Sequence, residues 1–140
     1  APFFDAELIR DSVARASVLK LSDEELEPVA SACRIGQADD PATTLRSILE
    51  HNGLDLVVMT RGADGALLLS PSEAIEQPGI PTEVRDTVGA GDSFTAALAT
   101  GLLRGDALTD VVRNACELAA FVCSQAGAVP GLPGSTSLKP

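Results

Sequence analysis

The stretch that decides the fold is Asp86-Thr87-Val88-Gly89-Ala90-Gly91-Asp92-Ser93-Phe94. The residues after Gly91 have the pattern of a helix, and the residues before Thr87 form the connection that leads into it. Gly89, Ala90 and Gly91 have almost no side chain and stand where a helix leaves its first backbone N–H groups unpaired. A phosphate can approach the main chain closely at such a place. The stretch therefore predicts an anion-binding site at a helix N-terminus.

Asp92 adds a chemical group to this predicted site. Its carboxylate falls in the first helical turn, beside the place where negative charge would be held. A loop that only bound phosphate would tend to avoid a second negative charge there. In phosphoryl transfer to a hydroxyl, positioning and electrostatic stabilisation do most of the catalysis, and an Asp accepts the proton of the attacking group. Asp92 is therefore predicted to be a general base.

The same residues have other interpretations. The plainest is a strand-to-helix turn, in which the glycines only permit unusual backbone angles and Asp92 complements the helix dipole. A dinucleotide fingerprint, Gly-x-Gly-x-x-Gly, fits less well, because Phe94 occupies the third glycine position and no acidic residue ends a strand about 20 positions later. A Walker A loop needs Gly-Lys-Ser/Thr, which this sequence lacks.

The stretch from Asp86 to Phe94, followed by Thr95-Ala96-Ala97-Leu98, resembles the C-terminal signature of the ribokinase-like (PfkB-type) sugar kinases. Two weaker features of that family occur in the right order, Leu19-Lys20-Leu21-Ser22-Asp23-Glu24-Glu25-Leu26 and Thr60-Arg61-Gly62-Ala63-Asp64-Gly65-Ala66. Ser22 stands where many members carry Asn, and this version looks most like the fructokinases. The resemblance covers nearly the whole chain, but only the C-terminal half of the family's usual pattern.

The resemblance implies transfer of the γ-phosphoryl group of ATP to a sugar hydroxyl, with magnesium. It makes Asp92 the base and Gly89-Ala90-Gly91 the anion hole. The residues that it places on the nucleotide and metal side are Ser22, Glu25, Thr60, Gly62 and Gly65, with Glu25 toward magnesium. Simpler explanations exist for all of them, since Ser-x-x-Glu is itself a capping box and a strand end with a turn accounts for the segment from Thr60 to Gly65. Context favours function for that segment, because ligands of open α/β sheets sit beyond the carboxyl ends of strands.

Two further roles rest on the resemblance alone. The tail resembles the family's Gly-Ala-x-x-x-x-Pro loop at Gly127, and main-chain carbonyls there, with those of Asp86 and Val88, are implied to hold a monovalent cation such as K⁺. Cys116 is aligned with a position that lines the adenine pocket, although a buried core cysteine is the commoner explanation and the one we prefer.

Composition sets the broad limits. The 140 residues are 45% hydrophobic, which is enough for one domain with a real core and too little for two. A net charge of −10 argues against partners that are nucleic acids or anionic membranes. No signal sequence or membrane-spanning run is evident, so the cytoplasm is the expected compartment. The chain begins at Ala1 without Met, which suggests a fragment or an internal junction.

Hydrophobic periodicity and turn residues predict the elements. The predicted helices cover 5–16, 23–34 (ended by Gly36), 41–52, 91–104 and 108–125. The predicted strands cover 17–21, 54–60, 66–69 and 74–77, of which 17–21 is expected to be a short buried strand and 54–60 a buried central strand. The first two strands are joined through helices, which predicts a parallel crossover, and the last two extend it as an antiparallel meander. The fold class is predicted to be α/β, a ribokinase-like three-layer α/β/α sandwich with a mainly parallel sheet.

The chain is thus expected to be one domain, residues 1–140, forming the C-terminal half of a fructokinase-like enzyme. Its sugar-binding half and lid would lie in a missing N-terminal half, and a homodimer is one option for the complete enzyme. Two alternatives stay open. One is a nucleoside or vitamin kinase of the same superfamily, and the other is a catalytically silent nucleotide-binding half that needs a partner chain.

Overall fold

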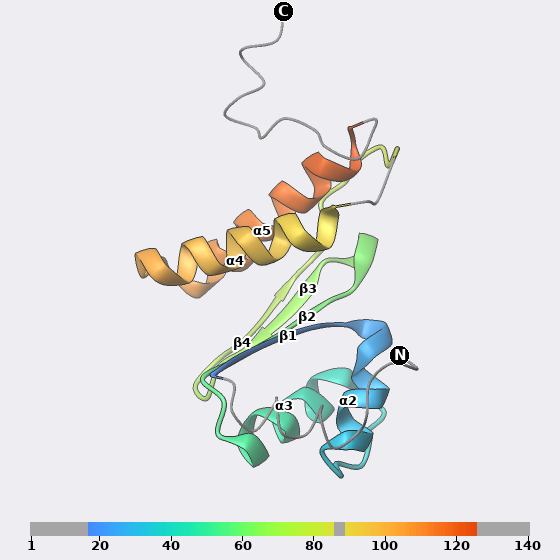
Figure 1. Ribbon diagram of the computed structural model, residues 1–140, viewed down its shortest axis with the longest axis vertical. Coiled ribbons are helices and arrows are strands. Elements are labelled where there is room, and N and C mark those ends of the chain that lie inside the picture. The colour runs from blue at the N-terminus through green and yellow to red at the C-terminus, as the bar shows by residue number, and fades with distance from the viewer. Residues whose placement is uncertain (1–16, 86–88, 126–140) are drawn as a thin grey trace, which may run out of the picture. The chain divides into compact units, whose positions relative to one another are not determined.

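The computed structural model describes residues 17–85 and 89–125 (Figure 1). The predicted helix 5–16 and the predicted cation-loop residues Asp86, Val88 and Gly127 lie outside the described residues. The chain divides into two compact units, one of Ala1–Gly62 with Ala66–Glu76 and one of Ala63–Gly65 with Gln77–Pro140.

Within the described residues, four strands form a mixed sheet in the order β1-β2-β3-β4. They are β1 (Val18–Ser22), β2 (Leu56–Thr60), β3 (Ala66–Leu69) and β4 (Ala74–Gln77). Strands β1 and β2 are parallel, with Ser22 opposite Thr60. Strands β2 and β3 are antiparallel, with Thr60 opposite Ala66. The predicted parallel pairing of the first two strands and the antiparallel pairing of the strand that follows them are confirmed, and β4 lies beside β3 as the meander predicts.

Strand β2 is central and buried, as its sequence predicts. Its residues Leu56, Val57, Val58 and Met59 are all at most 3% exposed. Strand β1 was expected to be buried as well, and this prediction is wrong for most of its length, because only Leu21 is buried and Val18 is 40% exposed. The physical reason is that β1 has a neighbour on only one side in the described part of the sheet.

Two helices pack on one face of this sheet, α2 (Leu26–Ala32) and α3 (Pro41–Asn52) (Figure 1). A 3₁₀ turn, η1 (Asp23–Glu25), precedes α2. Helix α3 begins and ends where its sequence predicts, since the Asp40 side chain accepts a hydrogen bond from the N–H of Ala42 and Gly53 closes the helix at φ 63°. The core between helices and sheet contains Leu21, Leu26, Ala30, Cys33, Leu45, Ile48, Leu49, Leu54, Val57, Met59 and Leu69.

The end of α2 differs from the sequence prediction. Gly36 was expected to stop the helix, but Arg34 takes the left-handed conformation instead, with φ 60°. The N–H of Arg34 donates to the carbonyl of Ser31 at 3.0 Å, and the N–H of Ile35 donates to the carbonyl of Ala30 at 2.9 Å. This is the Schellman arrangement, which is commonly completed by a hydrophobic contact of the residue after the turn. Ile35 packs against the core and so decides where the helix ends.

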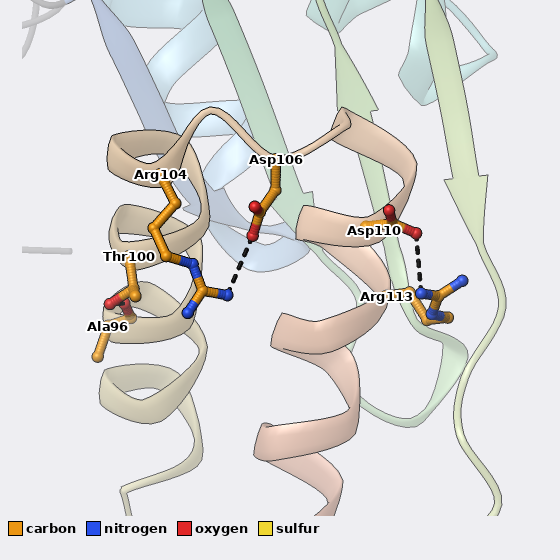
Figure 2. A network of polar contacts seen from close by, with 6 residues as sticks. All are labelled: Ala96, Thr100, Arg104, Asp106, Asp110 and Arg113. Atoms are coloured by element: carbon orange, nitrogen blue, oxygen red, sulfur yellow. Dashed lines mark hydrogen bonds and ion pairs between the residues drawn. The ribbon is translucent and has the colours of Figure 1, made fainter.

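The second unit contains helices α4 (Ala90–Arg104) and α5 (Leu108–Cys123), which lie side by side and run in opposite directions (Figure 1). Gly105, at φ 73°, ends α4. Ion pairs flank the connection, Arg104 with Asp106 at 3.1 Å and Arg113 with Asp110 at 2.8 Å (Figure 2). Such exposed pairs stabilise little. Among the described residues, no helix combines the length and the apolar character that a membrane span requires.

The helix end at Arg34 leads to a stability prediction. Arg34→Gly should raise the free energy of unfolding by about 0.5–1 kcal/mol, because a side chain in the left-handed conformation costs about 1–2 kcal/mol and the greater freedom of an unfolded glycine offsets part of that gain. Urea denaturation measures the change. Gly53→Ala is the matched control, since Gly53 has the same conformation with open space around it and should lose stability by a similar amount. A loss of stability in Arg34→Gly would contradict the assignment.

Candidate active site

The first turn of α4 has the geometry of an anion-binding helix end. Gly89 is the N-cap in the left-handed conformation, with φ 87°. The first hydrogen bond of the helix runs from the N–H of Ser93 to the carbonyl of Gly89, at 2.9 Å. The N–H groups of Ala90, Gly91 and Asp92 therefore have no acceptor within the described helix. Three such donors at the positive end of the helix dipole suit a phosphate.

Asp92 lies in this same turn and is exposed. The opposite side of the helix is anchored, because Phe94 and Leu98 are each 3% exposed. The hydroxyl of Thr95 donates to the carbonyl of Gly91 at 2.9 Å, within the helix. Helix α4 is thus packed through the face that carries Phe94 and Leu98, while the Asp92 carboxylate stays accessible to solvent.

A second group of predicted residues meets at the carboxyl ends of β1 and β2. Parallel pairing places Ser22 opposite Thr60. The N–H of Ser22 donates to Oε1 of Glu25 at 2.8 Å, and the Thr60 hydroxyl donates to the carbonyl of Leu21 at 3.5 Å. Gly62 follows Thr60 by two residues. Ser22, Glu25 and Thr60 are thus brought to one edge of the sheet, which is the edge where open α/β folds bind ligands.

The bond between Ser22 and Glu25 belongs to a capping box, so the structural interpretation of this pair is confirmed. It leaves room for the predicted role in metal binding. Glu25 is exposed, and a carboxylate has more acceptor positions than the one that this bond uses. Among the described residues, no three His, Cys, Asp or Glu side chains gather as a metal site. Magnesium commonly binds through one or two carboxylates together with phosphate oxygens and water, and an exposed Glu25 fits that type of site.

The glycines in and near the turn after β2 differ in how tightly the surrounding backbone packs against them. Gly62 has φ 57° and open space around it. Gly65 has φ 96°, and a Cβ on it would stand 1.9 Å from the carbonyl oxygen of Gln77. A Cβ on Gly79 would stand 1.7 Å from the carbonyl oxygen of Ala63. The close passage of two backbone segments is therefore enough to explain why residue 65 is a glycine, with no need for a ligand. The nucleotide-binding role of Gly65 stays a prediction.

Cys116 is 8% exposed on α5, where Val112 and Ala115 beside it are also buried. This burial supports the core explanation that the sequence favours. The proposed adenine contact stays a prediction. Gly101 is buried inside α4, although its sequence position alone did not predict a role for it. An isolated glycine within an alanine-rich helix was the signal available for it.

The comparisons with known proteins agree with this fold. A nucleoside kinase of Methanocaldococcus jannaschii, an archaeal member of the ribokinase family, superposes with a TM-score of 0.80 at 23% identity, over 94% of this chain and 41% of that one. At this identity the likeness shows the fold, and the predicted α/β ribokinase-like class is confirmed. The model of the pfkB family of carbohydrate kinases matches residues 1–134. The chain belongs to the pfkB family of carbohydrate kinases.

Two relatives place it within that family. An ATP-dependent 6-phosphofructokinase of Thermoanaerobacterium thermosaccharolyticum is 31% identical over 133 residues, which are 95% of this chain and 39% of that protein. Fructokinase-2 of Solanum lycopersicum is 34% identical over 125 residues, which are 84% of this chain and 36% of that protein. The chain thus spans about two fifths of the length of these relatives.

The two roles of Glu25 can be separated by substitution. Glu25→Ala removes the carboxylate from the capping box and should lower the free energy of unfolding by about 1 kcal/mol, whereas Glu25→Gln keeps an acceptor for the Ser22 N–H and should lower it less. Chemical denaturation measures both. If magnesium also depends on Glu25, Glu25→Gln should require several-fold more Mg²⁺ for half-maximal activity of the complete enzyme. Wild-type magnesium dependence in Glu25→Gln would leave only the capping role.

Proposed function

We propose that this chain is the C-terminal, nucleotide-binding and catalytic half of an ATP-dependent carbohydrate kinase that phosphorylates a sugar hydroxyl. The observation that carries the proposal is the first turn of α4, where three helix N–H groups without intrahelical acceptors stand beside an exposed Asp92 carboxylate. Phosphoryl transfer to a hydroxyl requires hydrogen-bond donors that stabilise the phosphoryl oxygens and a base that accepts the hydroxyl proton. Membership of the pfkB family supports it.

The reaction assigns a task to each part of the turn. The oxygen of the acceptor hydroxyl forms a bond to the γ-phosphorus of ATP, while the bond between that phosphorus and the β–γ bridging oxygen breaks and ADP leaves. The hydroxyl proton passes to the Asp92 carboxylate. Negative charge on the phosphoryl oxygens is stabilised by the N–H groups of Ala90, Gly91 and Asp92, which the helix already orients before the substrate arrives. Gly89 permits the sharp turn into the helix.

The remaining residues serve the nucleotide and the cations. Magnesium, when bound, neutralises charge on the nucleotide phosphates. We assign Glu25 to the magnesium side, and Ser22, Thr60, Gly62 and Gly65 to the nucleotide side. Main-chain carbonyls of Asp86, Val88 and Gly127 are proposed to bind K⁺, and Cys116 is retained as a candidate adenine contact of lower rank than its role in the core.

The acceptor is proposed to be a ketose of the fructose type, because the segment around Ser22 to Glu25 looks most like the fructokinases and a tomato fructokinase is among the relatives. The structural likeness to an archaeal nucleoside kinase keeps a nucleoside acceptor as the second candidate. A panel of fructose, other sugars and nucleosides, assayed with the complete protein, distinguishes the two.

Asp92→Asn tests the base. The change keeps the volume of the side chain and its capacity to stabilise a helix start but removes its ability to take a proton. We expect kcat to fall by at least about 10²-fold, the lower end of the range for general-base catalysis. The affinity for ATP should change little, and the melting temperature should stay near that of the wild type. If Asp92 only complements the helix dipole, turnover will also remain near normal, and that outcome would rule it out as the base.

The cation site makes a separate prediction. If K⁺ bound by the Asp86 and Gly127 segments orders the anion hole, replacing K⁺ by tetramethylammonium at constant ionic strength should lower kcat several-fold. The assay should be repeated with Na⁺ to separate ion size from ionic strength. Activity that is indifferent to all three cations would remove the monovalent-cation proposal and leave the rest intact.

A further inference from the structure

Gly101 occupies an unusual position for a glycine. It lies in the last third of α4 and is buried. Helix propensity favours alanine over glycine at such a place, and alanines are frequent in the preceding turns. A Cβ on Gly101 would stand 3.0 Å from Cγ2 and 3.4 Å from Cγ1 of Val111. Val111 is 1% exposed and branched at Cβ, so it has little freedom to move away.

The backbone of Gly101 is held at the same point. Its carbonyl accepts from the N–H of Asp106 at 3.0 Å, and the N–H of Gly105 donates to the carbonyl of Leu102 at 3.1 Å. These two bonds form the Schellman motif that ends α4. Gly101 is therefore where α4 is tied both to the connection between the helices and to the first turn of α5. The absence of a side chain at Gly101 sets how closely the two helices approach.

The other end of α5 holds the segment that leads toward the anion-binding turn. The N–H of Arg85 donates to the carbonyl of Cys123 at 2.7 Å. The hydroxyl of Thr82 donates to the carbonyl of Ala120 at 3.4 Å. Helix α5 is thus a common support: near its start it contacts Gly101 of α4, and near its end it binds the entry segment of α4.

We propose that Gly101 is a positioning residue for the reaction. Its contact with Val111 sets the place of α4 along and against α5, and so determines where the three N–H donors and the Asp92 carboxylate stand relative to the segment at Arg85. This inference rests on the proposed function of the α4 N-terminus. A displacement of α4 at Gly101 reaches the first turn of the helix because Phe94 and Leu98 are buried on the face that also carries Gly101, and close-packed residues of this kind transmit strain.

The first experiment adds one methyl group at the contact. In the complete enzyme, Gly101→Ala places a Cβ 3.0 Å from Val111, which is tighter than carbon atoms normally pack, so Val111 and the helix that carries it must give way by a few tenths of an ångström. A misplacement of about 1 Å can reduce catalysis by about 10²-fold, so we expect kcat to fall about tenfold or more. KM for ATP should rise by a smaller factor, because the donors act most strongly on charge that develops in the transition state.

Rescue distinguishes positioning from simple loss of activity. Val111→Ala removes the two methyl groups that the added Cβ would meet. The double variant Gly101→Ala/Val111→Ala should therefore recover kcat to within about threefold of Val111→Ala alone. If Gly101→Ala has the wild-type kcat, or if its loss is not recovered in the double variant, the proposal is wrong.

Gly105→Ala is the matched control. Gly105 has φ 73° and open space around it, so the substitution strains the end of the same helix without placing an atom between α4 and α5. It should lower the melting temperature and leave kcat within about twofold of the wild type. A role of Gly101 in stability alone would give Gly101→Ala the same result as this control. Asp92→Asn, assayed in parallel, tests the proposed base separately, because its outcome does not depend on the rescue.

Discussion

The buried central strand β2 is the constraint on which the first unit depends. A strand that is closed off from water must hydrogen-bond its backbone on both sides, because a buried N–H or carbonyl without a partner is costly. Strand β2 meets this need with β1 on one side and β3 on the other. The resulting register aligns Ser22, Thr60 and Ala66 across three strands. The capping turn after β1 and the turn after β2 therefore start from the same edge of the sheet.

The second unit solves a different problem. Its proposed functional feature is a helix end whose first N–H donors have no acceptor within the described helix, and such an end is favourable only when water or an anion satisfies it and the rest of the helix is firmly held. The inner face of α4 provides that support through Phe94 and Leu98, with Gly101 against Val111 near the other end. The exposed first turn is thus stabilised by contacts made along the whole length of the helix. Rigid support of this kind lets the donors keep one orientation before a substrate binds.

Several residues serve the fold and the proposed chemistry together. Glu25 accepts the Ser22 N–H in a capping box, and the same bond restricts the rotamers of a carboxylate that we assign to magnesium. Gly65 is required by the close passage of Gln77, and it also lies in the turn assigned to the nucleotide. A structural explanation for a residue therefore does not exclude a functional one here.

The sequence by itself determined the features that arise from local interactions. Asp40 and Gly53 set the two ends of α3, and Gly89 sets the start of α4, because caps and left-handed turns depend on residues only a few positions apart. The family could also be identified from the segment around Asp92, since that motif is continuous in the chain, and the family model confirmed it. Tertiary structure decided the rest. Arg34 rather than Gly36 takes the left-handed conformation after α2, because Ile35 reaches the core. Strand β1 is partly exposed because it has a single neighbour in the described sheet, and Gly101 meets Val111 only when α5 folds back on α4. Each of these depends on atoms that are distant in sequence, and no local pattern states which distant atoms will come into contact.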